Sequence, residues 1–79
     1  YIELKLRLAA SLLECRRRRH LTQMDLARFL RSSQSRIAKM ERGDPSVSLD
    51  LLVRSLLALG TSARQLSRVI ASRSPAPAA

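Results

Sequence analysis

The segment from Thr22 to Met40 constrains the fold most, because it contains two short amphipathic helices separated by only a few residues. Thr22 is a suitable N-cap for the first helix, and Asp25 stands three positions later, where an acidic side chain bonds back to the cap. Ser33 is a suitable N-cap for the second helix. Helices joined by so short a turn cross steeply, and in small basic proteins one of them usually enters the major groove of DNA. We therefore expect a DNA-binding module.

Apolar residues mark the inner faces of the two helices. Leu26 and Leu30 share one face of the first helix, and Ile37 and Met40 share one face of the second. Ala27 stands where the two axes approach most closely, and a small side chain fits there. On a helical wheel of roughly 100° per residue, burial of Ile37 and Met40 turns the opposite side of the second helix outward. The residues that we predict to contact base edges are Gln34, Ser35, Arg36, Ala38 and Lys39.

These features resemble the helix-turn-helix domain of the phage repressor and Cro-like family, often called the Xre family. The matching segments are Leu21-Thr22-Gln23, Leu26-Ala27, Ser33-Gln34-Ser35-Arg36-Ile37 and Met40-Glu41-Arg42-Gly43. The residues from Asp44 to Leu49 and from Leu56 to Gly60 also look like that family's fourth helix and its flanks. The resemblance covers roughly Leu8 to Val69 and implies an all-α, five-helix, lambda-repressor-like domain that binds double-stranded DNA with helices 2 and 3 and needs no cofactor.

The chain departs from the family pattern at two turns. The turn between the two central helices usually contains a glycine, and here it contains Arg31. The turn before Leu21 often contains one too, and here it is His20. If both positions need a left-handed backbone, each costs a non-glycine residue about 1 kcal/mol or more. Arg31 either adds a charge near the groove of the DNA or is a tolerated surface arginine.

The periodicity predicts five helices in one domain of residues 1–73, with the helix-turn-helix unit at about 22–42 and a Pro/Ala-rich tail at 74–79. The first helix has an ambiguous start, because residues 2–8 alternate as a half-buried strand would. A short N-terminal strand that pairs with a second subunit is the alternative there. The expected helices are Leu4 to Arg18, Gln23 to Leu30, Gln34 to Glu41, Leu49 to Leu59 and Ala63 to Ser72, the last two capped by Ser48 and by a Ser62–Gln65 capping box.

Several polar residues around the central unit are candidates for phosphate contacts. The run Arg16 to Arg19 ends the first helix, where basic side chains either complement the helix dipole or contact the DNA backbone, as the resemblance implies. Gln23 begins the second helix, where its N–H and side chain point toward a phosphate, and it can brace Gln34. The predicted phosphate-binding residues are Arg16, Gln23, Arg31, Ser33, Arg42 and Ser46.

The expected fourth helix is apolar over more than one face, whereas a single small core needs only one stripe. This surplus predicts a second buried surface, and a two-fold homodimer supplies one together with paired recognition helices roughly 34 Å apart. The alternative is a monomer with an over-hydrophobic core. The predicted dimer interface consists of Leu52, Leu56, Leu57, Leu66, Val69 and Ile70.

Fifteen Lys and Arg against six Asp and Glu give a net charge of +9, which favours a polyanionic partner. One Tyr and one Phe leave no aromatic platform for stacking the bases of single strands or RNA, so duplex DNA fits better. Cys15 is the single cysteine, so the fold contains no internal disulfide. We expect Cys15 to be a buried core thiol. No membrane-spanning run or secretory leader is visible, although the chain begins at Tyr1 rather than Met. We expect a cytoplasmic protein.

The sequence offers little for catalysis or metal binding. His20 is the only histidine, and no metal-binding or nucleotide-binding motif occurs, so we expect neither an enzyme nor a metal site. Three functional classes remain. The first is a sequence-specific transcriptional regulator, such as a phage-type repressor or a restriction–modification controller. The second is an antitoxin that also represses its own operon and binds a toxin protein. The third, disfavoured by the helix-turn-helix spacing, is a basic membrane-active helix.

Overall fold

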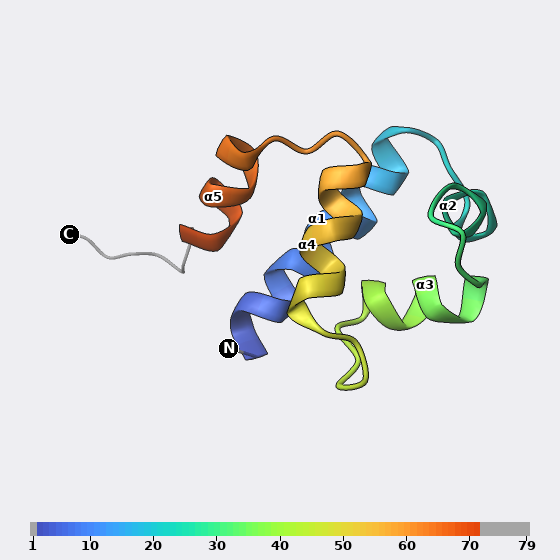
Figure 1. Ribbon diagram of the computed structural model, residues 1–79, viewed down its shortest axis with the longest axis horizontal. Coiled ribbons are helices and arrows are strands. Elements are labelled where there is room, and N and C mark those ends of the chain that lie inside the picture. The colour runs from blue at the N-terminus through green and yellow to red at the C-terminus, as the bar shows by residue number, and fades with distance from the viewer. Residues whose placement is uncertain (1, 72–79) are drawn as a thin grey trace.

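The structure, a computed structural model, describes residues 2–71 of the 79 in the chain. Those residues form five α-helices and no strand. Figure 1 shows α1 and α4 crossing at the centre, with α5 on one side and α2 and α3 on the other. The predicted all-α fold with five helices is confirmed. The helices are α1 (Ile2–Arg18), α2 (Gln23–Phe29), α3 (Gln34–Glu41), α4 (Leu49–Ala58) and α5 (Ala63–Ala71).

Hydroxyl side chains fix the starts of α2, α3, α4 and α5, because each accepts a hydrogen bond from a backbone N–H of the first turn. Thr22 Oγ1 accepts from the N–H of Asp25 at 3.0 Å, and the Asp25 carboxylate accepts from the N–H of Thr22 at 2.9 Å. Ser62 and Gln65 form the same reciprocal pair, at 3.1 and 2.9 Å. Both predicted capping boxes are therefore confirmed. The other two predicted caps, also confirmed, are Ser33 and Ser48.

The core lies around α1, against which α3, α4 and α5 all pack. Leu8 and Leu12 of α1 are fully buried at its centre. Ala27 of α2 is only 4% exposed, and α2 packs against α3. A larger side chain at that position would push the two helices apart. The largest fully buried side chains are Leu8, Leu12, Leu26, Ile37, Met40, Leu52 and Leu56.

The two turns that contain no glycine adopt the left-handed backbone considered in the sequence analysis. His20 has φ of 58° and Arg31 has φ of 56°. In each turn the next residue closes the preceding helix by a hydrogen bond, from the N–H of Leu21 to Arg16 O at 3.1 Å and from the N–H of Ser32 to Ala27 O at 2.7 Å. Helix-ending hydrogen bonds of this kind require a residue with positive φ just before the donor. The backbone strain at His20 and Arg31 is therefore a consequence of how the two helices end.

The helix ends differ from the sequence prediction by one or two residues. The first helix begins at Ile2 instead of Leu4, which excludes the alternative of a short strand at residues 2–8. The strand-like alternation covers only a few residues. The burial of Leu8 and Leu12 on one face of a helix outweighs it. The second helix ends one residue early, at Phe29, and the fourth ends at Ala58. The expected end of the fifth helix at Ser72, the domain boundary at 73 and the tail at 74–79 lie outside the described residues.

Burial within the chain accounts for much of the apolar surplus of α4 and α5. Leu52 is fully buried, Leu56 is 1% exposed and Leu66 is 6% exposed, all without a second chain. The prediction that these three residues form a dimer interface is corrected, because their surface is already covered by the chain's own core. Leu57 and Ile70 remain 48% and 44% exposed, and they are the members of the predicted set with the most free surface.

Cys15 lies at the edge of the core and is only half-buried, so the expectation of a buried thiol holds in part. It packs against buried residues of the core on one side. On its other side it lines a shallow groove between α1 and α5, together with Ser11 and Val69. The groove remains because α5 lies along α1 without covering it completely.

Candidate nucleic-acid interface

Helix α3 lies at the edge of the molecule, with its outer side uncovered by any other helix (Figure 1). Ile37 and Met40 anchor its inner side, at 0% and 1% exposure. The opposite side is open, and Gln34, Ser35 and Lys39 are exposed on it. This arrangement follows directly from the apolar spacing, because residues three apart share one face of a helix. A helix held at the surface in this way can enter a groove of a nucleic acid.

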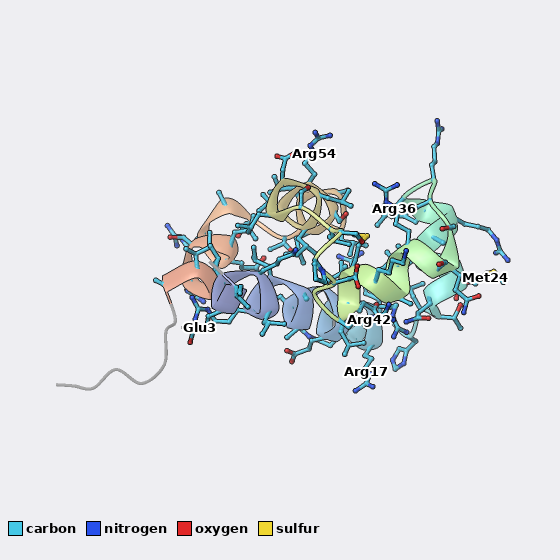
Figure 2. All side chains as sticks on the ribbon, turned by 90° about the horizontal axis from the view of Figure 1, so that it is seen from below. Glu3, Arg17, Met24, Arg36, Arg42 and Arg54 are labelled. Carbon is cyan, nitrogen blue, oxygen red and sulfur yellow. The ribbon has the colours of Figure 1, made fainter. Side chains whose placement is uncertain are left out.

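The five residues predicted to contact bases do not all have the same exposure. Arg36 is exposed, and Figure 2, seen from the side of α3, shows it and Arg42 on opposite sides of that helix. Ala38 is only half-buried, so part of its methyl group is accessible. The structure therefore brings the predicted set together along one helix. Their contact with bases stays a prediction.

Glu41, the last residue of α3, joins three helices through one carboxylate. Arg16 of α1 donates to it from Nε at 2.6 Å and from Nη2 at 3.1 Å. Gln23 of α2 donates to it from Nε2 at 3.0 Å. Arg16 also donates from Nη1 to Leu21 O at 2.8 Å, in the turn between α1 and α2. We call Arg16, Gln23 and Glu41 the Glu41 network.

The Glu41 network is largely withdrawn from solvent. The side chains of Arg16 and Glu41 are only 14% and 6% exposed. The hydrogen bond to Glu41 raises the pKa of Arg16, although burial acts in the opposite direction. A buried pair of this kind fixes geometry more than it adds stability, because desolvation offsets much of the attraction. The network therefore sets where the C-terminal end of α3 lies relative to α1 and α2.

The network corrects one predicted phosphate contact and one predicted contact between side chains. Arg16 directs its Nε, Nη1 and Nη2 groups inward, so it is a structural residue and we remove it from the phosphate-binding set. Gln23 bonds to Glu41, and so it does not brace Gln34 as expected. Sequence reasoning missed Glu41 altogether. A carboxylate that closes a helix can belong to a surface pair or to a buried one, and the sequence does not show which arginine faces it.

The other predicted phosphate-binding residues lie in the turns around α3. Ser33 is exposed and caps α3, with its Oγ 3.1 Å from the N–H of Arg36. Arg42 is exposed and lies 3.9 Å from the carboxylate of Asp44. Ser46 donates its hydroxyl and its backbone N–H to Asp44, and these two bonds lower the pKa of that carboxyl group. Asp44 thus orders the loop after α3.

Gly43 lets the same loop pass close to α1. Its φ is 66°, and a Cβ at this position would lie 2.8 Å from Leu6 Cδ2. Any other residue would need both a strained backbone and a displaced leucine side chain. The turn after α3 is therefore held against α1, and with it the exposed Arg42 and Ser46.

Ion pairing leaves an uneven distribution of positive charge. All six carboxylates of the chain lie among the described residues, and each faces an arginine within 4.0 Å. Arg31, Arg36 and Lys39 have no such partner, and all three are exposed in or just before α3. The candidate surface therefore combines uncompensated positive charge with an exposed helix. The other cations without a carboxylate partner among residues 2–71 are Lys5, Arg17, Arg19, Arg64 and Arg68.

No helix within residues 2–71 is long and apolar enough to cross a membrane. A family model described as a helix-turn-helix domain matches residues 7–69 of the chain. That match includes α2, α3 and the turn between them, and it extends over most of α1 and α5. No curated protein and no solved structure matches the chain.

Proposed function

Because the chain belongs to the helix-turn-helix domain family, a family of DNA-binding proteins, we propose that it binds double-stranded DNA sequence-specifically and regulates transcription. In this proposal α3 enters the major groove. The observation that carries it is the exposed, uncompensated charge of Arg31, Arg36 and Lys39 in α3 and the turn before it, with α3 anchored from behind by Ile37 and Met40. The resemblance to the Xre and phage-repressor type supports a repressor or a controller. The protein has no catalytic role in this proposal.

The proposed contacts divide into two classes. Gln34 is suited to a bidentate pair with adenine, and Arg36 to guanine. Ala38 offers a methyl group to thymine, and Ser35 lies on the same exposed side. Lys39 mainly adds affinity through phosphate. The residues proposed to hold phosphates from the surrounding turns are Gln23, Arg31, Ser33, Arg42 and Ser46.

A homodimer completes this proposal, because two copies present two α3 helices to successive major grooves. Leu57 and Ile70, each nearly half exposed, support an apolar contact between copies. A dimer of this kind prefers a palindromic site, in which each half is read by one copy. We propose a cytoplasmic location for it, where its DNA would be found.

The alternative is an antitoxin that binds its own operator and a toxin protein. It shares the DNA-binding surface with the regulator, and it needs a second surface for a protein partner. The identity of the neighbouring gene separates the two. A short toxin-like reading frame favours the antitoxin, and a restriction enzyme favours the controller.

Selection of duplexes from a random pool tests sequence-specific binding. We expect the chain to enrich one motif and to bind it about 10³-fold or more tightly than a scrambled duplex. Gln34→Ala relaxes the motif at the position that it contacts, at a cost of about 1–3 kcal/mol in discrimination. Ser67→Ala, an exposed change on α5, is the matched control. A variant at Gln34 that selects the same motif with the same affinity shows that α3 is not the recognition helix.

A further inference from the structure

A groove separates α3 and the turn before it from α4, directly beside the candidate DNA-binding surface. Its volume is about 320 Å³, at the lower end of the range found for ligand pockets. We call it the α3–α4 groove. Its floor is formed by Leu30, Met40 and Leu51, and its rim by Arg31, Arg36 and Arg54.

The floor of the α3–α4 groove leaves apolar surface in contact with solvent. Leu30 and Leu51 are only half-buried, although both pack against the core. Ser55 of α4 lines the same groove and is 5% exposed. The floor therefore offers mainly apolar contacts.

The rim of the groove carries more positive charge than the chain neutralises. Arg31 and Arg36 line the groove, and neither lies within 4.0 Å of a carboxylate among residues 2–71. Arg54 pairs with Asp50 at 2.8 Å, but both side chains are more than 60% exposed. An ion pair so open to water exchanges its partner easily. Three guanidinium groups are thus available for bidentate bonds to carboxylates.

We propose that the α3–α4 groove binds an acidic protein segment that carries an apolar side chain. Carboxylates of the segment pair with the rim arginines, and the apolar side chain covers Leu30 and Leu51. A phosphodiester strand uses the arginines but makes no use of an apolar floor. The volume of about 320 Å³ suits one or two side chains, and the open shape suits a segment that lies across the surface.

Binding in the groove has a regulatory consequence, which rests on the proposed function. Arg36 belongs both to the groove and to the residues proposed to contact bases, and Arg31 belongs both to the groove and to the proposed phosphate contacts. A segment in the groove and a duplex on α3 therefore exclude each other. The acidic partner acts as an inhibitor of DNA binding, and excess DNA releases it.

A labelled peptide tests the groove directly. The probe is acetyl-Glu-Glu-Leu-Phe-Glu-Glu-amide, and its control has serine in place of leucine and phenylalanine with the same charge. We expect the apolar peptide to bind about tenfold more tightly than the serine peptide, measured by fluorescence anisotropy. Equal binding of the two peptides overturns the proposal, because it means that the floor takes no part.

Three exposed single substitutions identify the site. Arg54→Gln weakens the apolar peptide severalfold and leaves duplex binding unchanged, because Arg54 lies on α4 and is not among the residues proposed to contact DNA. Lys39→Gln weakens duplex binding and leaves peptide binding unchanged. Arg68→Gln on α5 removes the same charge as Arg54→Gln and changes neither. If Arg68→Gln weakens the peptide as much as Arg54→Gln does, attraction is general and the groove proposal fails.

The same variants separate this proposal from the proposed function. If Arg54→Gln weakens duplex binding and spares the peptide, the groove is part of the DNA contact and the proposal is overturned. If the chain binds no duplex but Arg54→Gln still weakens the peptide, the proposed function fails and the groove proposal stands. If the unaltered chain binds both ligands, peptide and duplex should compete, because the two sites share Arg31 and Arg36; simultaneous binding overturns the proposed exclusion.

Discussion

Arg31 and His20 show how a fold can require a backbone conformation that its residue disfavours. Each closes a helix by a turn in which the next N–H reaches back to the helix, and this geometry sets φ near 57° whatever the side chain. Arg31 lies between α2 and α3 and adds an unpaired charge to the candidate surface. His20 lies at the end of α1. Because φ is nearly the same at both positions, the same substitution relieves similar backbone strain at each. A difference between the two variants in DNA binding then reports the charge of Arg31.

Glycine at either position should stabilise the chain. We expect His20→Gly and Arg31→Gly each to raise the free energy of unfolding by about 1 kcal/mol, because glycine adopts positive φ without steric strain. Arg31→Gly should also weaken duplex binding, whereas His20→Gly should change it little. Urea unfolding and duplex titration measure the two effects. Arg31→Ala is the control, since it removes the charge without relieving the strain, and a stability gain in that variant contradicts the explanation.

Substitutions at Lys39 and Gln34 should change the salt dependence of duplex binding differently. Lys39→Ala should weaken specific and scrambled duplexes alike, because a phosphate contact carries no sequence information. The slope of log K against log salt should become shallower by about 0.9 if one phosphate contact is lost. Gln34→Ala should leave the slope nearly unchanged. Titrations of both variants across a salt series test this, and equal slopes for Lys39→Ala and the unaltered chain would exclude a phosphate contact at that residue.

At the scale of helices, the sequence predicted the elements well and their mutual contacts poorly. The N-caps at Thr22 and Ser33 were predictable because a cap bonds to residues only two or three positions away. The start of α1 was not, since residues 2–8 alternate in a way that also fits a strand. Arg16 and Glu41 lie 25 positions apart, and no local pattern indicates that they meet. The candidate recognition surface was therefore predictable from α3 alone, whereas the Glu41 network and the α3–α4 groove were not.

Loss of one member of the Glu41 network should be more damaging than loss of two. Arg16→Met leaves the Glu41 carboxylate buried without its cation, which typically costs about 3–5 kcal/mol of stability. The double variant Arg16→Met/Glu41→Leu removes both charges, so we expect it to recover most of that loss. Unfolding of the unaltered chain, the two single variants and the double variant measures the coupling. Additive losses in the double variant show that the two side chains do not interact.

The carboxyl group of Asp25 should make the N-terminal end of α2 sensitive to acid. Hydrogen bonds from the backbone N–H and the side chain of Thr22 lower the pKa of Asp25 below its usual value near 3.9. A carboxyl group whose pKa is lower in the folded state stabilises the fold above the unfolded pKa and loses that effect as the pH falls through the folded pKa.

Asp25→Asn should therefore be less stable than the unaltered chain at neutral pH. The difference in urea midpoint between the two proteins should shrink as the pH falls below about 4 and vanish once the pH lies below the folded pKa of Asp25, where both side chains are neutral. Urea unfolding of both proteins across this range measures it. A difference that stays constant with pH shows that the asparagine acts by another route, such as poorer geometry in the capping box.

For the whole molecule, the candidate DNA-binding helix and the exposed apolar residues Leu57 and Ile70 belong to different elements. The uncompensated cations Arg31, Arg36 and Lys39 gather around α3. Leu57 and Ile70 belong to α4 and α5, and Figure 1 shows α5 on the opposite side of the α1–α4 pair from α2 and α3. A contact between two copies through Leu57 and Ile70 thus leaves both α3 helices free. This separation is what a protein that binds a two-part DNA site as a dimer requires.

A charge at Leu57 should disrupt this contact between copies. Leu57 is 48% exposed, so Leu57→Glu does not disturb the core, but it buries a carboxylate wherever two copies meet through this residue. We expect the variant to sediment as a monomer at concentrations where the unaltered chain associates. Its affinity for a palindromic duplex should fall, whereas its weak affinity for a single half-site should stay the same. Met24→Glu is the control for self-association, since Met24 is 50% exposed on α2 and lies at the end of the molecule opposite α5 in Figure 2. An unaltered chain that is monomeric at every concentration excludes the dimer, and equal association of Leu57→Glu places the contact elsewhere.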